Sequence, residues 1–131
     1  MGTRTLIVPA GLELLVEKYH YAPGVLVGDT LYVSGQVGRD AELRVIEDKE
    51  AQFEQAFVNV GKVLAAAGMG FADVVELETW MTDFQADLPL LLRVKDKFLG
   101  ATVPTWTGFG VKGFSMPGIA LEVKVTAVRG A

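Results

Sequence analysis

The chain has 131 residues, which is enough for a single domain, residues 1–131, around one hydrophobic core. Half of the residues are hydrophobic and only 21% are charged, so a monomer of this size would leave apolar surface in water. This excess favours an oligomer. The formal net charge is -4 and there is no basic run, whereas nucleic-acid binding needs a positive surface. The composition therefore argues against a nucleic-acid partner.

The chain has no cysteine and a single histidine, His20. The lack of cysteine excludes disulfides and thiolate chemistry, and one histidine cannot build the usual metal site within one chain. We therefore expect no bound metal. No run approaches the roughly 20 apolar residues that span a bilayer, and the N-terminal segment does not have the pattern of a secretion signal. These features predict a cytoplasmic protein without a membrane partner.

The N-terminal third predicts short strands. Residues 3–8 are rich in β-forming residues and are followed by a proline, which is typical of an edge strand. Residues 11–19 fit neither the helical nor the strand period cleanly, so a short helix and an irregular connection both remain open. Residues 24–27 and 30–34 flank Gly28-Asp29 and predict a tight hairpin.

The hairpin ends at Ser34-Gly35-Gln36, and the polar residues 38–47 predict a surface loop. A helix is then expected over residues 48–67, with Asp48 as its N-cap and Gly68 in the left-handed position after its end. Apolar residues at helical spacing form its buried stripe: Phe53, Ala56, Phe57, Val60, Val63 and Leu64.

The next segment predicts a strand and a second helix. Residues 73–82 alternate, so we expect Val75, Leu77, Thr79 and Met81 on one face and Val74, Glu76, Glu78 and Trp80 on the other. Asp87 is the expected N-cap of the second helix, and Pro89 then lies in its first turn, where a missing N–H costs little.

The last segment predicts two strands, residues 104–111 and 119–128, joined by turn residues. In the second strand one face is wholly apolar and should pack on helices. The other carries Glu122 and Lys124 among small residues, which indicates a partly wet surface. Because a strand–helix–strand unit normally joins parallel strands, the sequence predicts an α+β fold: a mixed sheet with two helices on one face.

Several short motifs now resemble one known family. The run Gly28 to Gln36 (GDTLYVSGQ) is similar to a hairpin and strand end of the Rid (YjgF/RidA-type) family, formerly called L-PSP endoribonucleases. The similarity continues in order through the later segments, covering about residues 21–128. The matching positions are Gln52, Asn59, Leu64 to Gly68, Asp73 to Val75, Thr82-Asp83, Pro104 and Leu121 to Val123.

The resemblance implies a chorismate-mutase-like fold assembled as a homotrimer, with small-molecule clefts between subunits. It also implies hydrolysis of reactive enamines or imines without a cofactor. In the deaminase subgroup an arginine two residues after the proline pairs with the substrate carboxylate, and here Trp106 stands at that place. An indole carries no positive charge, so the sequence predicts a non-standard substrate, an imine without a free carboxylate.

The resemblance further implies a role for six residues. Glu122 matches the carboxylate that positions water, and the expected substrate-binding residues are Tyr21, Ser34, Gly35, Trp106 and Thr107. We expect Trp106 and Glu122 to line one cleft that contains no fixed positive charge. Structural interpretations remain open for these residues: Ser34 as a hydroxyl bonded to backbone, Tyr21 packed beside Pro23, and Trp106 as a core or interface residue.

Three functions remain open from the sequence. The first is a Rid-like hydrolase acting on a small imine or enamine. The second is a non-catalytic trimer that binds a small metabolite or another protein. The third, RNA cleavage, is weakened by the acidic balance and by the lack of two histidines that could serve as general acid and base.

Overall fold

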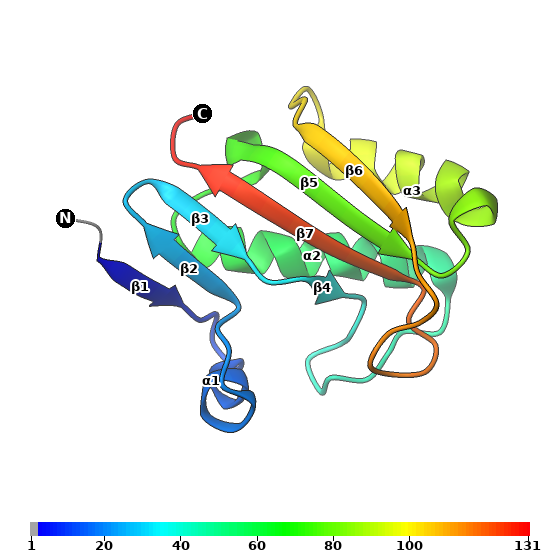
Figure 1. The fold of residues 1–131 in the computed structure, drawn as a ribbon, viewed down its shortest axis with the longest axis horizontal. Helices are drawn as coiled ribbons and strands as arrows, with labels where there is room; N and C mark the ends of the chain where they lie inside the picture. Colours follow the sequence, from blue (N-terminus) through cyan, green and yellow to red (C-terminus); the bar gives the residue numbers. More distant parts are fainter. Residues whose placement is uncertain (1–2) are drawn as a thin grey trace.

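The computed structural model describes residues 3–131 as one mixed β-sheet with helices on one face (Figure 1). The path through the sheet is β1-β2-β3-β7-β5-β6, and the short β4 pairs with β7. All neighbours are antiparallel except β5 and β6. The strands are β1 (Arg4–Ile7), β2 (Gly24–Val27), β3 (Thr30–Val33), β4 (Gln36–Val37), β5 (Val74–Met81), β6 (Thr105–Gly110) and β7 (Leu121–Val128). The predicted α+β mixed sheet, edge strand and hairpin are confirmed.

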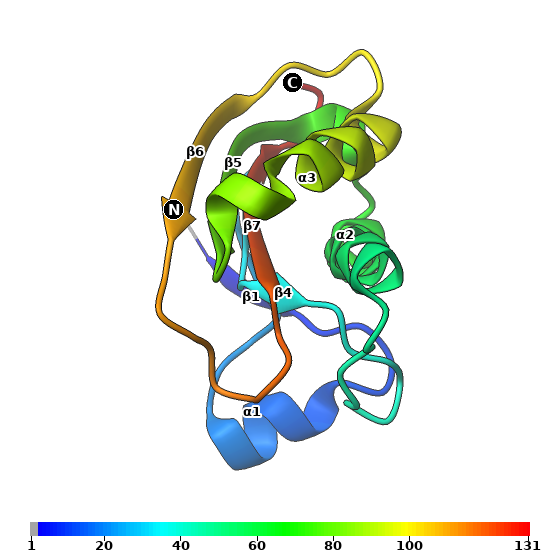
Figure 2. The same ribbon diagram turned by 90° about the vertical axis from the view of Figure 1, so that its right-hand side faces the viewer.

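Two long helices, α2 (Lys49–Ala66) and α3 (Phe84–Leu99), cover the same face of the sheet, as the side view shows (Figure 2). The Asp48 side chain accepts a hydrogen bond from the Ala51 amide at 3.0 Å, and Gly68 has φ +71°. Both predicted ends of α2 are therefore confirmed. All six residues of its expected apolar stripe are fully buried. This buried stripe holds α2 against the sheet, because removing apolar area from water is the main favourable term in folding.

The central strand β7 has the predicted two-sided character. Its apolar face is buried under the helices, with Leu121, Val123, Val125 and Ala127 all at most 1% exposed. The opposite face, with Glu122 and Lys124, is half-buried and is not covered by any helix within residues 3–131 (Figure 2). We call this surface the open face.

Strand β5 departs from the predicted alternation at its start. Val74 is buried and Val75 is exposed, the reverse of the expected arrangement. The pairing with β7 shifts between Val74 and Glu76, so Val75 is the extra residue of a β-bulge. From Leu77 onward the predicted faces are correct. A bulge inverts the faces on one side of it, and strict alternation cannot reveal it.

The second helix begins earlier than predicted. Asp83, not Asp87, is the N-cap residue of α3, and Pro89 lies inside the helix. Asp87 is buried and forms an ion pair at 3.1 Å with Lys49 of α2. This carboxylate therefore joins the two helices instead of capping one.

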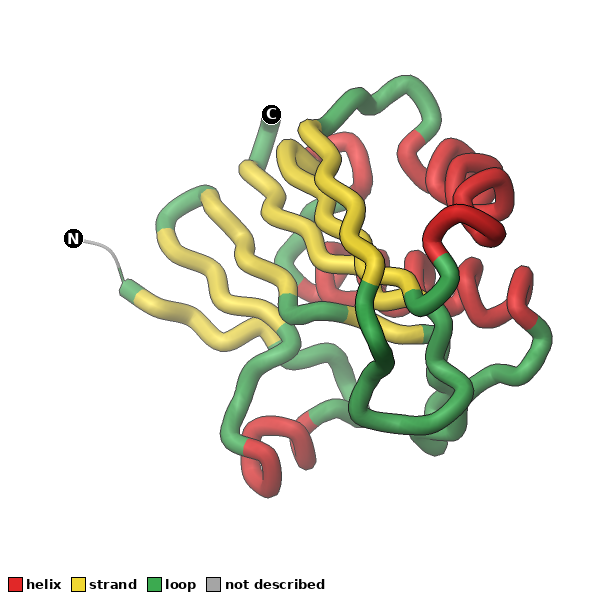
Figure 3. The backbone as a smooth tube through the Cα atoms, turned by 45° about the vertical axis from the view of Figure 1, so that its right-hand side comes forward, coloured by secondary structure: helices red, strands yellow, loops and turns green. Residues whose placement is uncertain are grey.

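Three further elements were not predicted definitely from the sequence. Residues Glu13–Tyr19 form a third helix, α1, which lies beyond one end of the sheet and not on the face covered by α2 and α3 (Figure 3). The residues that were expected to end the hairpin continue as β4, whose Val37 is paired with Glu122. A short 3-10 turn, Phe71–Asp73, leads into β5.

Candidate functional site

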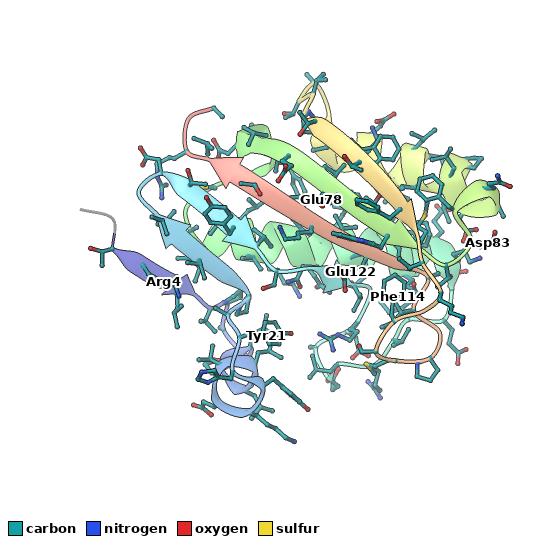
Figure 4. The ribbon with its side chains drawn as sticks, viewed as in Figure 1. Arg4, Tyr21, Glu78, Asp83, Phe114 and Glu122 are labelled. Atoms are coloured by element: carbon teal, nitrogen blue, oxygen red, sulfur yellow. The ribbon has the colours of Figure 1, made fainter. Side chains whose placement is uncertain are left out.

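Glu122 lies on the open face near the start of the central strand β7, where β7 is flanked by β4 and β5 (Figure 4). Its cross-strand neighbours are Val37 on one side and Trp80 on the other. Trp80 stacks on Phe109 of β6, with ring centroids 5.3 Å apart. The carboxylate is thus positioned by three paired strands and lies beside an aromatic surface.

The Glu122 carboxylate makes no hydrogen bond and no salt bridge with any residue in the described part of the chain, 3–131. Burial raises the pKa of Glu122, because a partly dry environment penalises the charged form. The nearby Arg39 guanidinium acts in the opposite direction and lowers that pKa. Glu122 is therefore a half-buried carboxyl whose oxygens remain available to a ligand or a water.

Gly35 provides the space that Glu122 occupies. A Cβ atom at position 35 would stand 2.5 Å from Glu122 Oε2 and 2.6 Å from its Cδ. Ser34, one residue earlier, donates its hydroxyl to the Ala22 carbonyl at 2.6 Å. The Ser34 hydroxyl proton is therefore bonded to backbone, as the structural interpretation of Ser34 expected, and this bond holds the end of β3 against the preceding segment.

Tyr21 lies below the sheet next to α1 (Figure 4) and is 41% exposed. It lines a pocket of about 130 Å³ between the N-terminal segment, the 36–43 segment and α2. Gln36, Arg39 and Lys62 supply polar groups to this pocket, and Leu15 supplies part of its apolar wall. Tyr21 is thus accessible to a small molecule, as a binding role requires.

Within one chain, Trp106 does not share a surface with Glu122, so the expected common cleft stays a prediction about the assembly. The Trp106 indole N–H donates to the Thr79 hydroxyl at 3.0 Å, and the Lys95 ammonium lies 5.1 Å from the indole ring centre. Thr79 is fully buried on the helix-covered face, so Trp106 faces the helices and Glu122 faces away from them. Only two different subunits could bring these side chains into one cleft.

Thr107, the residue after Trp106 on β6, lies on the open face, where it is paired with Glu78 of β5. Glu78 in turn is paired with Lys124 of β7 and lies 3.9 Å from its ammonium. Thr107 and Glu122 therefore share the open face, at opposite sides of β5.

Arg39 is a charged residue near Glu122 that was not expected. It lies in the segment 38–47, for which only a surface loop was predicted, and its guanidinium lowers the pKa of Glu122. The expectation of a cleft without fixed positive charge stays a prediction. The signal that was available is an arginine four residues beyond Gly35. Its significance depends on the pairing of β4 with β7, which no periodicity in the sequence indicates.

Neither a metal site nor a membrane-spanning helix was found in the described residues. Among residues 3–131 there is no group of three or more His, Cys, Asp or Glu side chains that could hold a metal ion. No helix in the same range is both long and apolar enough to cross a bilayer.

Comparisons with known proteins identify the family. The sequence profile described as Endoribonuclease L-PSP matches residues 14–129. The chain is 34% identical over 128 residues to the RutC family protein YjgH of Escherichia coli, covering 97% of this chain and 96% of that protein. A solved structure of protein YJGH superposes with a TM-score of 0.85 over 95% of each chain. A more distant relative is the 2-iminobutanoate/2-iminopropanoate deaminase of Bos taurus, 30% identical over 112 residues, or 84% of this chain and 80% of the relative. The chain therefore belongs to the Rid family, also known as the YjgF or L-PSP family.

Proposed function

We propose that this protein hydrolyses a small imine or enamine to a carbonyl compound and ammonia, in a cleft completed by a second subunit. The observation that carries this proposal is Glu122, an unpaired and half-buried carboxylate on a rigid central strand with a raised pKa. Distant relatives are 2-iminobutanoate/2-iminopropanoate deaminases, which supports the reaction class.

The proposed reaction needs few groups and no cofactor. A protonated imine carbon is electrophilic, and Glu122 accepts a proton from the water that attacks it. The same carboxyl then returns this proton to the nitrogen, the C–N bond breaks, and ammonia leaves while the attacking oxygen becomes the carbonyl oxygen. The departing ammonia takes up the remaining proton of the attacking water from that oxygen, so that an iminium ion and water give a carbonyl compound and ammonium. The raised pKa of Glu122 suits both steps, because a general acid–base group works best with a pKa near the working pH.

The cleft is proposed to lie between subunits of a homotrimer. In the described part of the chain no helix covers the open face, which carries exposed apolar side chains, including Tyr32 and Phe109. Trp106 faces the other side of the sheet, so its contribution to a shared cleft with Glu122 would come from a neighbouring copy. A trimer would bury apolar surface that a monomer leaves in water.

The test is a panel of imines generated in place by amino-acid and amine oxidases. Ammonia release is followed against the rate without the protein. Glu122→Gln should lower kcat/KM by about 100-fold or more, since general acid–base catalysis contributes about that much. Glu76→Gln is the matched control, because Glu76 lies on the same face and its carboxylate accepts a hydrogen bond from Thr126. Tight ligand binding without any acceleration would instead indicate a non-catalytic binding protein and refute the proposal.

A further inference from the structure

Within residues 3–131, Arg4 and Arg39 are the two arginines that form no salt bridge, and of these only Arg39 lines a pocket. Arg44, Arg93 and Arg129 each lie within 4.0 Å of a carboxylate oxygen. Within residues 3–131, Arg39 has no such contact, and its guanidinium reaches only the Met116 sulfur, at 3.9 Å. A thioether is a weak acceptor and a guanidinium carries five N–H donors. Most of the hydrogen-bonding capacity of Arg39 is therefore unused.

The backbone at Arg39 is held in place from two sides. The Arg39 amide donates to the Val37 carbonyl at 2.9 Å, and the Arg39 carbonyl accepts from the Asn59 side chain of α2 at 3.1 Å. Val37 is the β4 residue paired with Glu122, so Arg39 leaves the sheet only two residues beyond the neighbour of that carboxylate. The guanidinium is thus attached to a fixed point beside Glu122.

Arg39 and Glu122 are near each other but do not form an ion pair. The Arg39 charge lowers the pKa of Glu122. The two side chains nevertheless form no salt bridge, so their charged atoms are more than 4.0 Å apart. Arg39 also lines the pocket of about 130 Å³ that contains Tyr21 and Gln36. Glu122 does not line this pocket itself, but its strand partner Val37 directly follows Gln36, which does. An unpaired cation in a pocket, two residues beyond the strand partner of an unpaired anion, fits a small molecule that carries both charges.

We propose that Arg39 is the specificity-determining residue of this site and binds the anionic group of the substrate, while the protonated imine nitrogen faces Glu122. This inference rests on the proposed function and narrows its substrate to imines that carry a carboxylate. A guanidinium suits this role, because its parallel N–H groups match the two carboxylate oxygens. It also revises the expectation of a carboxylate-free substrate, which assumed that the cleft has no fixed positive charge.

The first experiment measures binding without turnover. The probe is 2-oxobutanoate, an unreactive carboxylate with the skeleton of a 2-imino acid, titrated calorimetrically into the intact protein. Arg39→Gln should weaken its binding about ten- to a hundredfold, the effect of losing a charge-assisted pair. Arg39→Lys keeps the positive charge but loses the two parallel N–H donors, so its affinity for 2-oxobutanoate should lie between those of the unmodified protein and Arg39→Gln. Arg44→Gln is the matched control in the same segment and should bind like the unmodified protein, since Arg44 pairs with Asp40 at 3.1 Å.

The second experiment compares two imines, one formed from 2-aminobutanoate and one formed from butylamine. Arg39→Gln should raise KM for the carboxylate-bearing imine about ten- to a hundredfold and change kcat/KM for the other by less than about threefold. Equal losses on both imines would overturn the inference, because Arg39 would then only position Glu122. The inference would also be overturned if 2-oxobutanoate does not bind, or if Arg39→Gln leaves its affinity unchanged. Arg39-dependent binding of 2-oxobutanoate with no imine hydrolysis would support Arg39 as the anion site and refute the proposed reaction.

Discussion

The buried amide of Gln52 should be one of the largest single contributors to stability around the site. Its side-chain amide donates to the Ile46 and Gly118 carbonyls, both at 2.9 Å. Its oxygen accepts the Ala120 amide at 2.8 Å. Gln52 is only 2% exposed and thereby joins α2 to the segment that leads into β7, the strand of Glu122.

The perturbation is Gln52→Leu, which keeps the side-chain volume and removes all three bonds. The Ala120 amide lies in a buried residue and is left without a partner, which costs about 1–3 kcal/mol. The Ile46 and Gly118 carbonyls are closer to solvent and can bind water, so we add about 1 kcal/mol for both. The expected loss in the free energy of unfolding is about 2–4 kcal/mol. For a domain of this length that corresponds to a fall in Tm of roughly 6–16 °C.

The assay is equilibrium unfolding in urea, together with thermal melting, at one fixed protein concentration because an oligomer's stability depends on it. Gln55→Leu is the matched control: Gln55 lies on the same helix, is only partly buried, and makes a single side-chain bond, to Asn59 at 2.8 Å. Its cost should be below about 1 kcal/mol. If Gln52→Leu costs no more than Gln55→Leu, with equal dependence on urea, the three bonds do not stabilise the fold as argued.

Three further predictions concern the assembly and the site. Light scattering at micromolar concentration should give three times the chain mass of 14.1 kDa, and a clean monomer would refute the trimer. Glu122→Gln should raise Tm at pH 7, because burial raises the pKa of Glu122 and its charged form destabilises the fold. The gain should shrink as the pH falls through this raised pKa and be lost below the ordinary value of 4.5, and a gain that is independent of pH would contradict this. Trp106→Phe should cost about 1–2 kcal/mol in urea unfolding by leaving the buried Thr79 hydroxyl without its donor; an unchanged midpoint would show that this bond is not stabilising.

Local chemistry explains which parts of the fold were predictable. The ends of α2 depend on one side chain each, Asp48 and Gly68, and both have the expected geometry. The faces of β7 follow from strict alternation under a single covering layer. The predicted faces of β5 are wrong at Val74 and Val75, because Val75 is an extra residue opposite β7. Asp87 was expected to cap a helix, but its partner is Lys49, 38 positions away in sequence. A contact over that distance leaves no local signal.

The candidate site shows the same division between local and distant causes. The family resemblance identified Glu122, Gly35 and Tyr21 as residues to examine, and the structure places Gly35 directly against the Glu122 carboxylate. It gave no indication of Arg39, because the position of that side chain depends on the two-residue strand β4 and its pairing with β7. Two residues are too few to produce a periodic pattern.

The arrangement of Trp106 and Arg39 bears on how a site of this kind can change its ligand. Trp106 uses its N–H on Thr79 and lies under Lys95, so within one chain its polar group is already satisfied. An anion near Glu122 would need compensation for its desolvation, and the unpaired charge within the described chain that acts on Glu122 is Arg39. Whether an anionic ligand can bind therefore depends on where the cationic side chain lies relative to Glu122, and less on its position in the sequence. If Arg39 serves this purpose, a substitution at position 106 alone would not decide whether carboxylates bind.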